Sequence, residues 1–161
     1  MRLTTFTDYS LRVLIYLAAE PGRRATIAEI SSAFGVSEHH LTKVVHFLGQ
    51  QGWLANVRGK GGGVELAQPP EAIGIGAVVR AAEGDAMPAE CFNRESGGSH
   101  CSIVRICRLR SLLSEAVDAF EAVLERSTLA DLVAHDQPAL ARVLQIPRAA
   151  APRGRSGQAS H

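Results

Sequence analysis

The sequence predicts a mostly α-helical protein with one small β-hairpin. Apolar residues repeat at helical spacing through residues 8–50 and again through residues 105–127. Between these regions, two short segments with alternating apolar residues, 53–57 and 64–67, flank a glycine-rich loop. The chain has 161 residues, of which 46% are hydrophobic and 20% charged. This composition is typical of one compact globular domain and excludes a disordered or fibrous protein.

The first helix is expected to begin at Thr7 or Asp8, because either side chain can cap the free N–H groups of a first turn. Pro21-Gly22 ends it. A second helix should begin after Thr26, since Glu29 three residues later completes a reciprocal capping box.

A tight turn follows the second helix. Gly35 ends that helix, Val36 is apolar, and Ser37 can cap a third helix that runs to about Gln50. This is the helix-turn-helix pattern, and the helix after Ser37 is the one that would enter the major groove of DNA. The side chains predicted to contact DNA from this helix are Ser37, Glu38, His39, His40, Thr42 and Lys43.

The hairpin after the third helix is predicted to be a wing. Its loop carries Arg58, Gly59, Lys60 and Gly61, and glycines allow the backbone to approach a minor groove or phosphates closely. Residues 1–83 therefore form a predicted winged helix-turn-helix DNA-binding domain. A nucleotide phosphate loop is disfavoured, because Gly61 follows Lys60 where that motif needs Ser or Thr. A plain hairpin turn is the remaining alternative.

Residues 84–107 are a polar segment that holds all three cysteines, Cys91, Cys101 and Cys107. Their spacing favours metal or cluster binding over a redox-sensitive thiol or inert cysteines. Zinc fits poorly, because the close pair of cysteines typical of structural zinc sites is missing. The odd number of cysteines and the lack of a visible secretory signal or membrane span predict a cytoplasmic protein without disulfides and without membrane association.

The C-terminal region, 105–140, is predicted to be helical, with one long amphipathic helix over residues 105–127. That helix is too long for one small domain to cover, so we expect it to pair with its copy in a homodimer. Such a dimer presents two recognition helices to palindromic double-stranded DNA. Residues 146–161, rich in proline, arginine and small residues, are predicted to be a disordered tail. The predicted dimerisation residues are Leu109, Leu112, Leu113, Ala116, Val117, Phe120, Val123 and Leu124.

Several segments resemble the NsrR-type nitric-oxide-sensing repressors, which belong to a winged-helix family that also includes IscR. The resemblance covers residues 1–140 and is carried by LTTFTDYSLR at 3–12, VRGKGGG at 57–63, CRL at 107–109 and TLADLV at 128–133.

This resemblance implies an iron–sulfur cluster held by Cys91, Cys101 and Cys107, with 4Fe-4S favoured and 2Fe-2S as the alternative. It also implies a fourth, carboxylate ligand at the start of the first helix of the partner subunit, and Asp8 stands at the matching position. The gap between the first two cysteines is longer than in the family, and His100 in that longer segment is an alternative fourth ligand.

The resemblance further implies a transcriptional repressor that releases its operator when nitric oxide reacts with the cluster. Two alternatives stay open at this point: an IscR-like regulator of iron–sulfur supply or redox state, and a metal-free thiol switch. We do not expect an enzyme, because the sequence contains no nucleophile–base motif and no cofactor-binding fingerprint.

Overall fold

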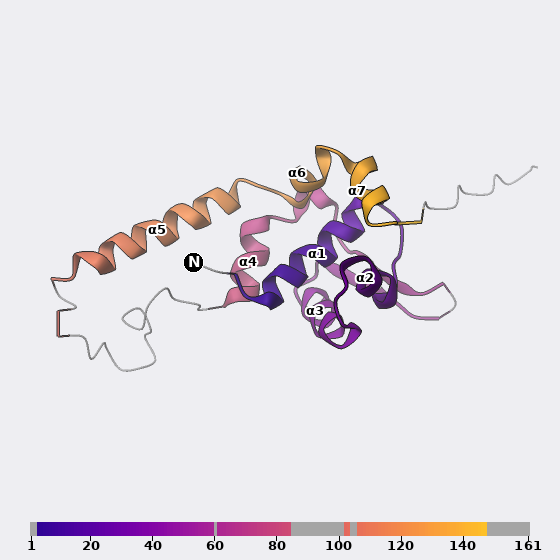
Figure 1. The fold of residues 1–161 in the computed structure, drawn as a ribbon, viewed down its shortest axis with the longest axis horizontal. Helices are drawn as coiled ribbons and strands as arrows, with labels where there is room; N and C mark the ends of the chain where they lie inside the picture. The colour runs from indigo at the N-terminus through magenta and orange to yellow at the C-terminus, as the bar shows by residue number, and fades with distance from the viewer. Residues whose placement is uncertain (1–2, 60, 85–101, 104–105, 148–161) are drawn as a thin grey trace, which may run out of the picture.

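The structure, a computed structural model, describes residues 3–59, 61–84, 102–103 and 106–147 (Figure 1). The described residues form seven α-helices, one two-stranded antiparallel sheet and a short 3₁₀ turn, as the predicted fold class requires. The elements are α1 (Thr5–Ala19), α2 (Ile27–Phe34), α3 (Glu38–Gln50), β1 (Leu54–Val57), β2 (Gly63–Leu66), the 3₁₀ turn (Pro70–Ala72), α4 (Ile75–Glu83), α5 (Arg108–Glu125), α6 (Leu129–Ala134) and α7 (Gln137–Val143).

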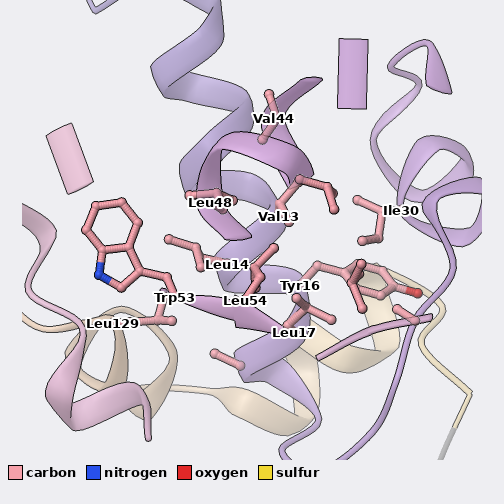
Figure 2. Packing of buried hydrophobic residues seen from close by; sticks show 14 of the residues in the cluster. Val13, Leu14, Tyr16, Leu17, Ile30, Val44, Leu48, Trp53, Leu54 and Leu129 are labelled. Atoms are coloured by element: carbon pink, nitrogen blue, oxygen red, sulfur yellow. The ribbon is translucent and has the colours of Figure 1, made fainter. Parts of the chain in front are cut away.

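Helix α1 is the centre of the fold. It contacts α2, α3, β2, α4, α6 and α7, and it lies between α3 and the C-terminal helices (Figure 1). Its sequence is apolar on more than one side, so it can be covered from several directions at once. Val13 and Leu14 are fully buried, and they pack with Leu48 of α3 and Trp53 at the start of the hairpin (Figure 2).

The beginning of α1 differs from the prediction. The helix begins at Thr5, and its N-cap is Thr4, whose hydroxyl accepts a hydrogen bond from the backbone N–H of Thr7 at 3.2 Å. The predicted start at Thr7 or Asp8 is therefore wrong. Thr7 is buried inside the first turn, and Asp8 lies on the helix rather than at its cap.

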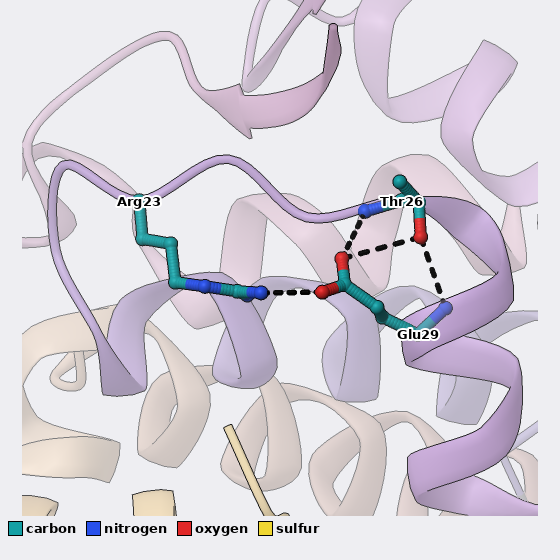
Figure 3. A network of polar contacts seen from close by, with 3 residues as sticks. All are labelled: Arg23, Thr26 and Glu29. Atoms are coloured by element: carbon teal, nitrogen blue, oxygen red, sulfur yellow. Dashed lines mark hydrogen bonds and ion pairs between the residues drawn. The ribbon is translucent and has the colours of Figure 1, made fainter. Parts of the chain in front are cut away.

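The second helix begins as predicted. The hydroxyl of Thr26 accepts from the backbone N–H of Glu29 at 3.2 Å, and the Glu29 carboxylate accepts from the backbone N–H of Thr26 at 2.6 Å (Figure 3). Arg23, from the loop after α1, donates to the same carboxylate. Gly35 ends α2 in the left-handed conformation, with φ of 63°, which explains the glycine at the turn into α3.

The hairpin pairs Leu54 with Leu66 and Val57 with Gly63. Strand β1 begins one residue later than predicted, and β2 begins one residue earlier. A further bridge joins Val64 to Ala25, in the loop before α2. This bridge attaches strand β2, near the wing loop, to the segment that precedes α2.

Helix α5 projects away from the rest of the molecule (Figure 1). It runs from 108 to 125, slightly shorter than the predicted 105–127, and none of its residues is buried. Its C-terminal end packs on α4, where Arg80 forms an ion pair with Glu125. Gly76 of α4 lies so close to Glu125 that a Cβ there would be 2.8 Å from the Glu125 carboxylate.

The last described residues belong to the folded domain. Ile146 is buried in the core, and its backbone N–H donates to the carbonyl of Ala141 at 2.9 Å. The predicted disordered tail therefore does not include Ile146, and residues 148–161 lie outside the described residues. None of the helices in the described ranges is both long and apolar enough to cross a membrane.

Candidate nucleic-acid interface and metal ligands

Helix α3 presents a polar surface to solvent. Ser37 caps it by accepting from the backbone N–H of His40 at 3.4 Å, as predicted. The helix buries one apolar face and leaves the opposite face exposed. We call the exposed residues from Ser37 to His46 the recognition surface: Ser37, Glu38, His39, His40, Thr42, Lys43 and His46. The structure thus brings all six predicted DNA-contacting residues of this segment onto one surface, together with His46.

Some of these side chains are already held by the protein. The hydroxyl of Thr42 donates to the carbonyl of Glu38 at 2.8 Å. The ring of His40 lies against the ring of Tyr9 from α1, with 6.3 Å between centroids, and its Nδ1 is 3.1 Å from the Ser37 hydroxyl. In the described part of the chain, the side chains of Glu38 and Lys43 have neither a hydrogen bond nor an ion pair. These two charged groups are therefore available to a partner.

The wing carries a second cation and follows α3 in the sequence, as expected of a winged helix. Arg58, Gly59 and Gly61 are exposed at the tip, whereas Lys60 lies outside the described residues. Gly62 is required by close packing, because a Cβ there would lie 2.4 Å from the carbonyl oxygen of Val57. A larger residue at position 62 would therefore displace the backbone around Val57.

Asp8 lies near the start of α1 with its carboxylate about half exposed. Arg12, one turn later, holds both carboxylate oxygens: its Nε donates to Oδ1 at 3.0 Å and a terminal nitrogen lies 2.8 Å from Oδ2. Since Thr4 provides the cap, the simplest structural role for Asp8, that of N-cap, is excluded. The carboxylate is accessible and held by one surface ion pair.

Arg12 connects this carboxylate to the helix-turn-helix unit. Its guanidinium carbon lies 6.0 Å from the centre of the Tyr9 ring and 5.8 Å from that of Phe34. Phe34 is the last residue of α2, and Tyr9 contacts His40 in the first turn of α3. Asp8 is thus two contacts away from α2, through Arg12, and three contacts away from α3, through Arg12 and Tyr9.

Cys107 is the only one of the three predicted cysteine ligands that lies within the described residues. It immediately precedes α5, is half-buried and forms no disulfide. Cys91, Cys101 and His100 lie outside the described residues. Within the ranges that the structure describes, no group of three or more metal-binding side chains comes together.

The start of the cysteine segment is fixed by a contact between the end of α4 and the N-cap of α1. Glu83 at the end of α4 accepts from the backbone N–H of Thr4 at 2.7 Å and from the Thr4 hydroxyl at 3.1 Å. Burial alone would raise the pKa of Glu83, but these bonds and one from Thr7 outweigh it, so that the pKa lies below its usual value. Sequence analysis missed this contact, because nothing local links residues 79 positions apart.

The predicted dimerisation residues divide into two groups. Phe120 and Leu124 pack against the core of their own chain. Leu109 and Leu112 are 60% and 61% exposed, and Val123 is 55% exposed. Leu113 and Val117 are half-buried, and Ala116 is exposed. The N-terminal half of α5 thus leaves large apolar side chains in solvent, next to Ile106, which is 81% exposed.

Comparisons with known proteins agree with this architecture. The Rrf2 family, described as an iron-dependent transcriptional regulator, matches residues 3–135. The HTH-type transcriptional regulator NsrR of Bacillus subtilis (strain 168) is 48% identical over 134 residues, which cover 83% of this chain and 90% of that protein. The NsrR of Geobacillus kaustophilus (strain HTA426) is 44% identical over 149 residues, 92% of this chain and 99% of its own length. The resemblance to NsrR-type regulators is confirmed.

Solved structures share the fold. CymR, the global cysteine regulator of B. subtilis, is 28% identical with a TM-score of 0.67, covering 84% of this chain and 98% of its own. IscR of T. potens is 26% identical with a TM-score of 0.66, covering 83% of this chain and 87% of its own. These likenesses confirm the predicted winged-helix fold.

The Glu83 contact generates a prediction about stability and pH. Because the folded-state pKa of Glu83 is depressed, its contribution is present above the unfolded-state pKa, about 4.3, and is lost as the pH falls through the folded value. Glu83→Gln should lower the free energy of unfolding by about 1 kcal/mol at pH 7, since the bonds are partly exposed. Urea denaturation should show this difference shrinking as the pH falls below the unfolded-state value and through the folded-state pKa of Glu83.

The matched control is Glu71→Gln, an exposed carboxylate on the 3₁₀ turn, which should leave the free energy of unfolding unchanged. An equal loss for Glu83→Gln at pH 7 and pH 3 would contradict the electrostatic origin of the effect.

Proposed function

The chain belongs to the Rrf2 family of transcriptional regulators, and on that premise we propose that it is a dimeric repressor that senses nitric oxide through an iron–sulfur cluster and then releases its operator. The observation that carries the proposal is the position of Asp8. It lies on the helix that contacts the helix-turn-helix unit, with its carboxylate exposed and free of any capping role.

The recognition surface supports DNA binding by this winged helix. Lys43 on α3 and Arg58 on the wing are exposed cations, and the first turn of α3 carries Glu38 and His39. Residues in the first turn of a recognition helix face base edges, whereas cations at its side and on the wing reach phosphates. On this proposal the first turn of α3 contacts base edges, whereas Lys43, Arg58, Lys60 and the backbone of Gly59 and Gly61 contact phosphates.

The apolar part of α5 supports a homodimer. Large exposed apolar side chains on a helix that the described residues cover only at one end favour a partner, and a second copy supplies a self-complementary surface. Two copies would place two recognition helices at one palindromic site.

Thiolates are the usual protein ligands of iron–sulfur clusters, so the donor set of this chain fits such a group. Cys91, Cys101 and Cys107 would hold it, with the partner subunit's Asp8 as the fourth ligand. The two of these residues that lie within the described ranges fit this role: Cys107 forms no disulfide, and the Asp8 carboxylate is reachable from solvent. Bound there, the cluster would supply an iron whose weakly held oxygen ligand leaves it accessible to nitric oxide.

Arg12 is the residue of this chain that would pass the change to DNA. A carboxylate that ligates a metal gives up part of its pairing with Arg12. The guanidinium also lies over the rings of Tyr9 and Phe34. Phe34 belongs to α2, and Tyr9 contacts His40 of α3, so the two rings connect Arg12 to both helices beside the turn. A shift of Arg12 would therefore alter how α1 supports the recognition helix.

Two other functions would use the same fold. The structural likeness to IscR of T. potens favours an IscR-like response to iron–sulfur supply or redox state, with a 2Fe-2S cluster, as the second candidate. A metal-free thiol switch is the third, and it requires purified protein that holds no iron under anaerobic conditions.

The DNA-binding assignment predicts the effect of removing single cations. Lys43→Ala and Arg58→Ala should each weaken binding by ~10-fold and lower the salt slope by about 0.9 for every phosphate contact that is lost. The probe is a duplex that the protein itself selects from a random 30-base-pair pool, and affinity is measured by fluorescence anisotropy at several salt concentrations.

Arg142→Ala is the matched control, because Arg142 is an exposed cation on α7, across α1 from the recognition helix. If both test variants bind the selected duplex like the parent at every salt concentration, the assignment of helix and wing is wrong.

The assignment of Asp8 predicts a change in nitric oxide response without loss of the cluster. Native mass spectrometry of anaerobically purified protein should show a dimer with one cluster per subunit, and successive additions of nitric oxide should shift its mass. Asp8→Ala should keep the cluster, because three thiolates remain, but should change the number or order of nitric oxide adducts. Asp118→Ala, an exposed carboxylate on α5, is the control.

An unchanged titration for Asp8→Ala would remove Asp8 from the mechanism. Metal-free wild-type protein with three free thiols, even after reconstitution, would overturn the cluster and leave the thiol switch.

The dimer proposal predicts that charge on α5 separates the subunits. Leu112→Glu places a carboxylate in the centre of the exposed apolar part of α5, and burial of an unpaired charge is costly. Light scattering should therefore show a dimer for the parent and a monomer for Leu112→Glu. Ser111→Glu, one residue earlier and about 100° around the helix, should stay dimeric. A dimer for both variants would place the interface elsewhere.

A further inference from the structure

The recognition helix carries an unusual set of ionisable residues. Helix α3 contains one carboxylate, Glu38, and one ammonium, Lys43, so their formal charges cancel. Its other ionisable side chains are three histidines, His39, His40 and His46. With neutral imidazoles, this helix offers no net positive charge to a DNA backbone, although phosphate neutralisation provides most of the affinity of such proteins.

Two of the histidines lie in line with Lys43. His39, Lys43 and His46 follow the spacing i, i+4, i+7, so they occupy one stripe along the helix, and all three are exposed. His40 lies off this stripe, with its ring against Tyr9 and its Nδ1 beside the Ser37 hydroxyl. The stripe His39–Lys43–His46 thus has a permanent cation, Lys43, between two side chains that become cations when protonated.

The elements packed against α3 add no free carboxylate to this stripe. On α1, Asp8 is paired with Arg12, and the ring that meets the recognition surface is that of Tyr9. On α2, Glu29 is held by Arg23 and by the N-terminus of its own helix. Strand β1 contains no ionisable residue. On α3 itself, Glu38 precedes His39 in the sequence, and the ring of His40 lies 6.1 Å from the ring of His39, centroid to centroid.

We propose that His39 and His46 contact DNA phosphates as imidazolium ions and make the affinity for the operator rise as the pH falls. This inference rests on the proposed DNA-binding function but not on the iron–sulfur cluster. It adds His46 to the DNA-contacting residues and gives His39 a second role beside base contact.

The physical basis is reciprocal linkage between protons and DNA. Imidazole changes charge between pH 5 and pH 8, and the negative field of a duplex stabilises the protonated form. By linkage, the factor by which protonation strengthens DNA binding equals the factor by which bound DNA strengthens proton binding. Each imidazolium that reaches a phosphate adds about 0.9 to the salt slope. Two such contacts change the affinity by ~10-fold over a fourfold change in salt concentration.

The test measures binding of the full-length, anaerobically purified protein to the selected duplex at about pH 6 and about pH 8, each over a range of salt concentrations. The parent should bind ~10-fold or more tightly at the lower pH, with a salt slope steeper by about 2 or more. In the double variant His39→Gln/His46→Gln, both the affinity difference and the slope difference should be largely lost. His135→Gln, an exposed histidine at the end of α6, should behave like the parent.

A second double variant separates charge from shape. His39→Lys/His46→Lys keeps the positive charge at both pH values, so it should bind at about pH 8 with the steep salt slope that the parent shows at about pH 6. A merely structural role for the two histidines would not produce this rescue.

Each other outcome contradicts the inference in a recognisable way. If the parent binds equally at both pH values, or if the glutamine variant keeps the full pH dependence, the two histidines do not carry it and the DNA-binding function stands. If the protein selects no duplex from the pool at either pH, DNA binding itself fails and the inference fails with it.

Discussion

The burial of α1 from several sides is the constraint on which the rest of the structure depends. Val13, Leu14 and Leu17 of this helix are almost inaccessible, and α2, α3, β2, α4, α6 and α7 all contact it. A helix covered in this way cannot move independently of its neighbours, because close-packed interiors transmit small displacements instead of absorbing them. Its first turn carries Asp8, and its middle supports the recognition helix. Both candidate sites therefore share one rigid support.

The two ends of α1 are attached to elements far away in the sequence. At the N-terminal end, Glu83 of α4 holds Thr4, so the helix start lies where α4 leads into the cysteine segment. At the C-terminal end, the side chain of Gln137 donates to the carbonyl of Ala18 at 3.1 Å and connects α7. These polar contacts fix α1 along its axis, whereas the apolar core fixes it laterally. Displacement of the first turn would thus reach α3 through the shared core.

The elements themselves could be predicted from the sequence wherever a local signal defines them. Thr26 with Glu29, Gly35 and Ser37 each specify a helix end through their own side chain or backbone, and all three were predicted and confirmed. The start of α1 was predicted wrongly because Thr4, Thr7 and Asp8 are all competent caps. Burial of Thr7 in the core, a tertiary effect, decides between them.

The candidate sites could be predicted only in part, for a similar reason. The exposed side of α3 follows from helical periodicity, and the i, i+4 spacing of Asp8 and Arg12 is a readable signal for an ion pair. The contacts of Arg12 with Phe34, of Tyr9 with His40 and of Glu83 with Thr4 depend on how helices cross. No local pattern encodes those crossings. When two chains share a ligand set, as proposed for Asp8, the fold of one chain does not define which side chains come together.

The energies of the contacts around Arg12 limit how the proposed switch can work. A half-exposed ion pair such as Asp8–Arg12 contributes about 0.2–1 kcal/mol. Each cation–π contact of Arg12, with Tyr9 and with Phe34, contributes about 0.5–1 kcal/mol at such a site. One subunit thus has about 1–3 kcal/mol available from this group of contacts, and a 100-fold loss of operator affinity requires about 2.7 kcal/mol.

One subunit reaches that requirement only if every contact of Arg12 is lost at its upper value. Two subunits acting together reach it with ordinary values. The proposed dimer would therefore do more than match the symmetry of a palindromic site. Because its two recognition helices bind one duplex, the small contributions from both copies of Arg12 add in a single binding equilibrium. On this argument, a moderate rearrangement at each first turn suffices for release, and neither winged helix has to unfold.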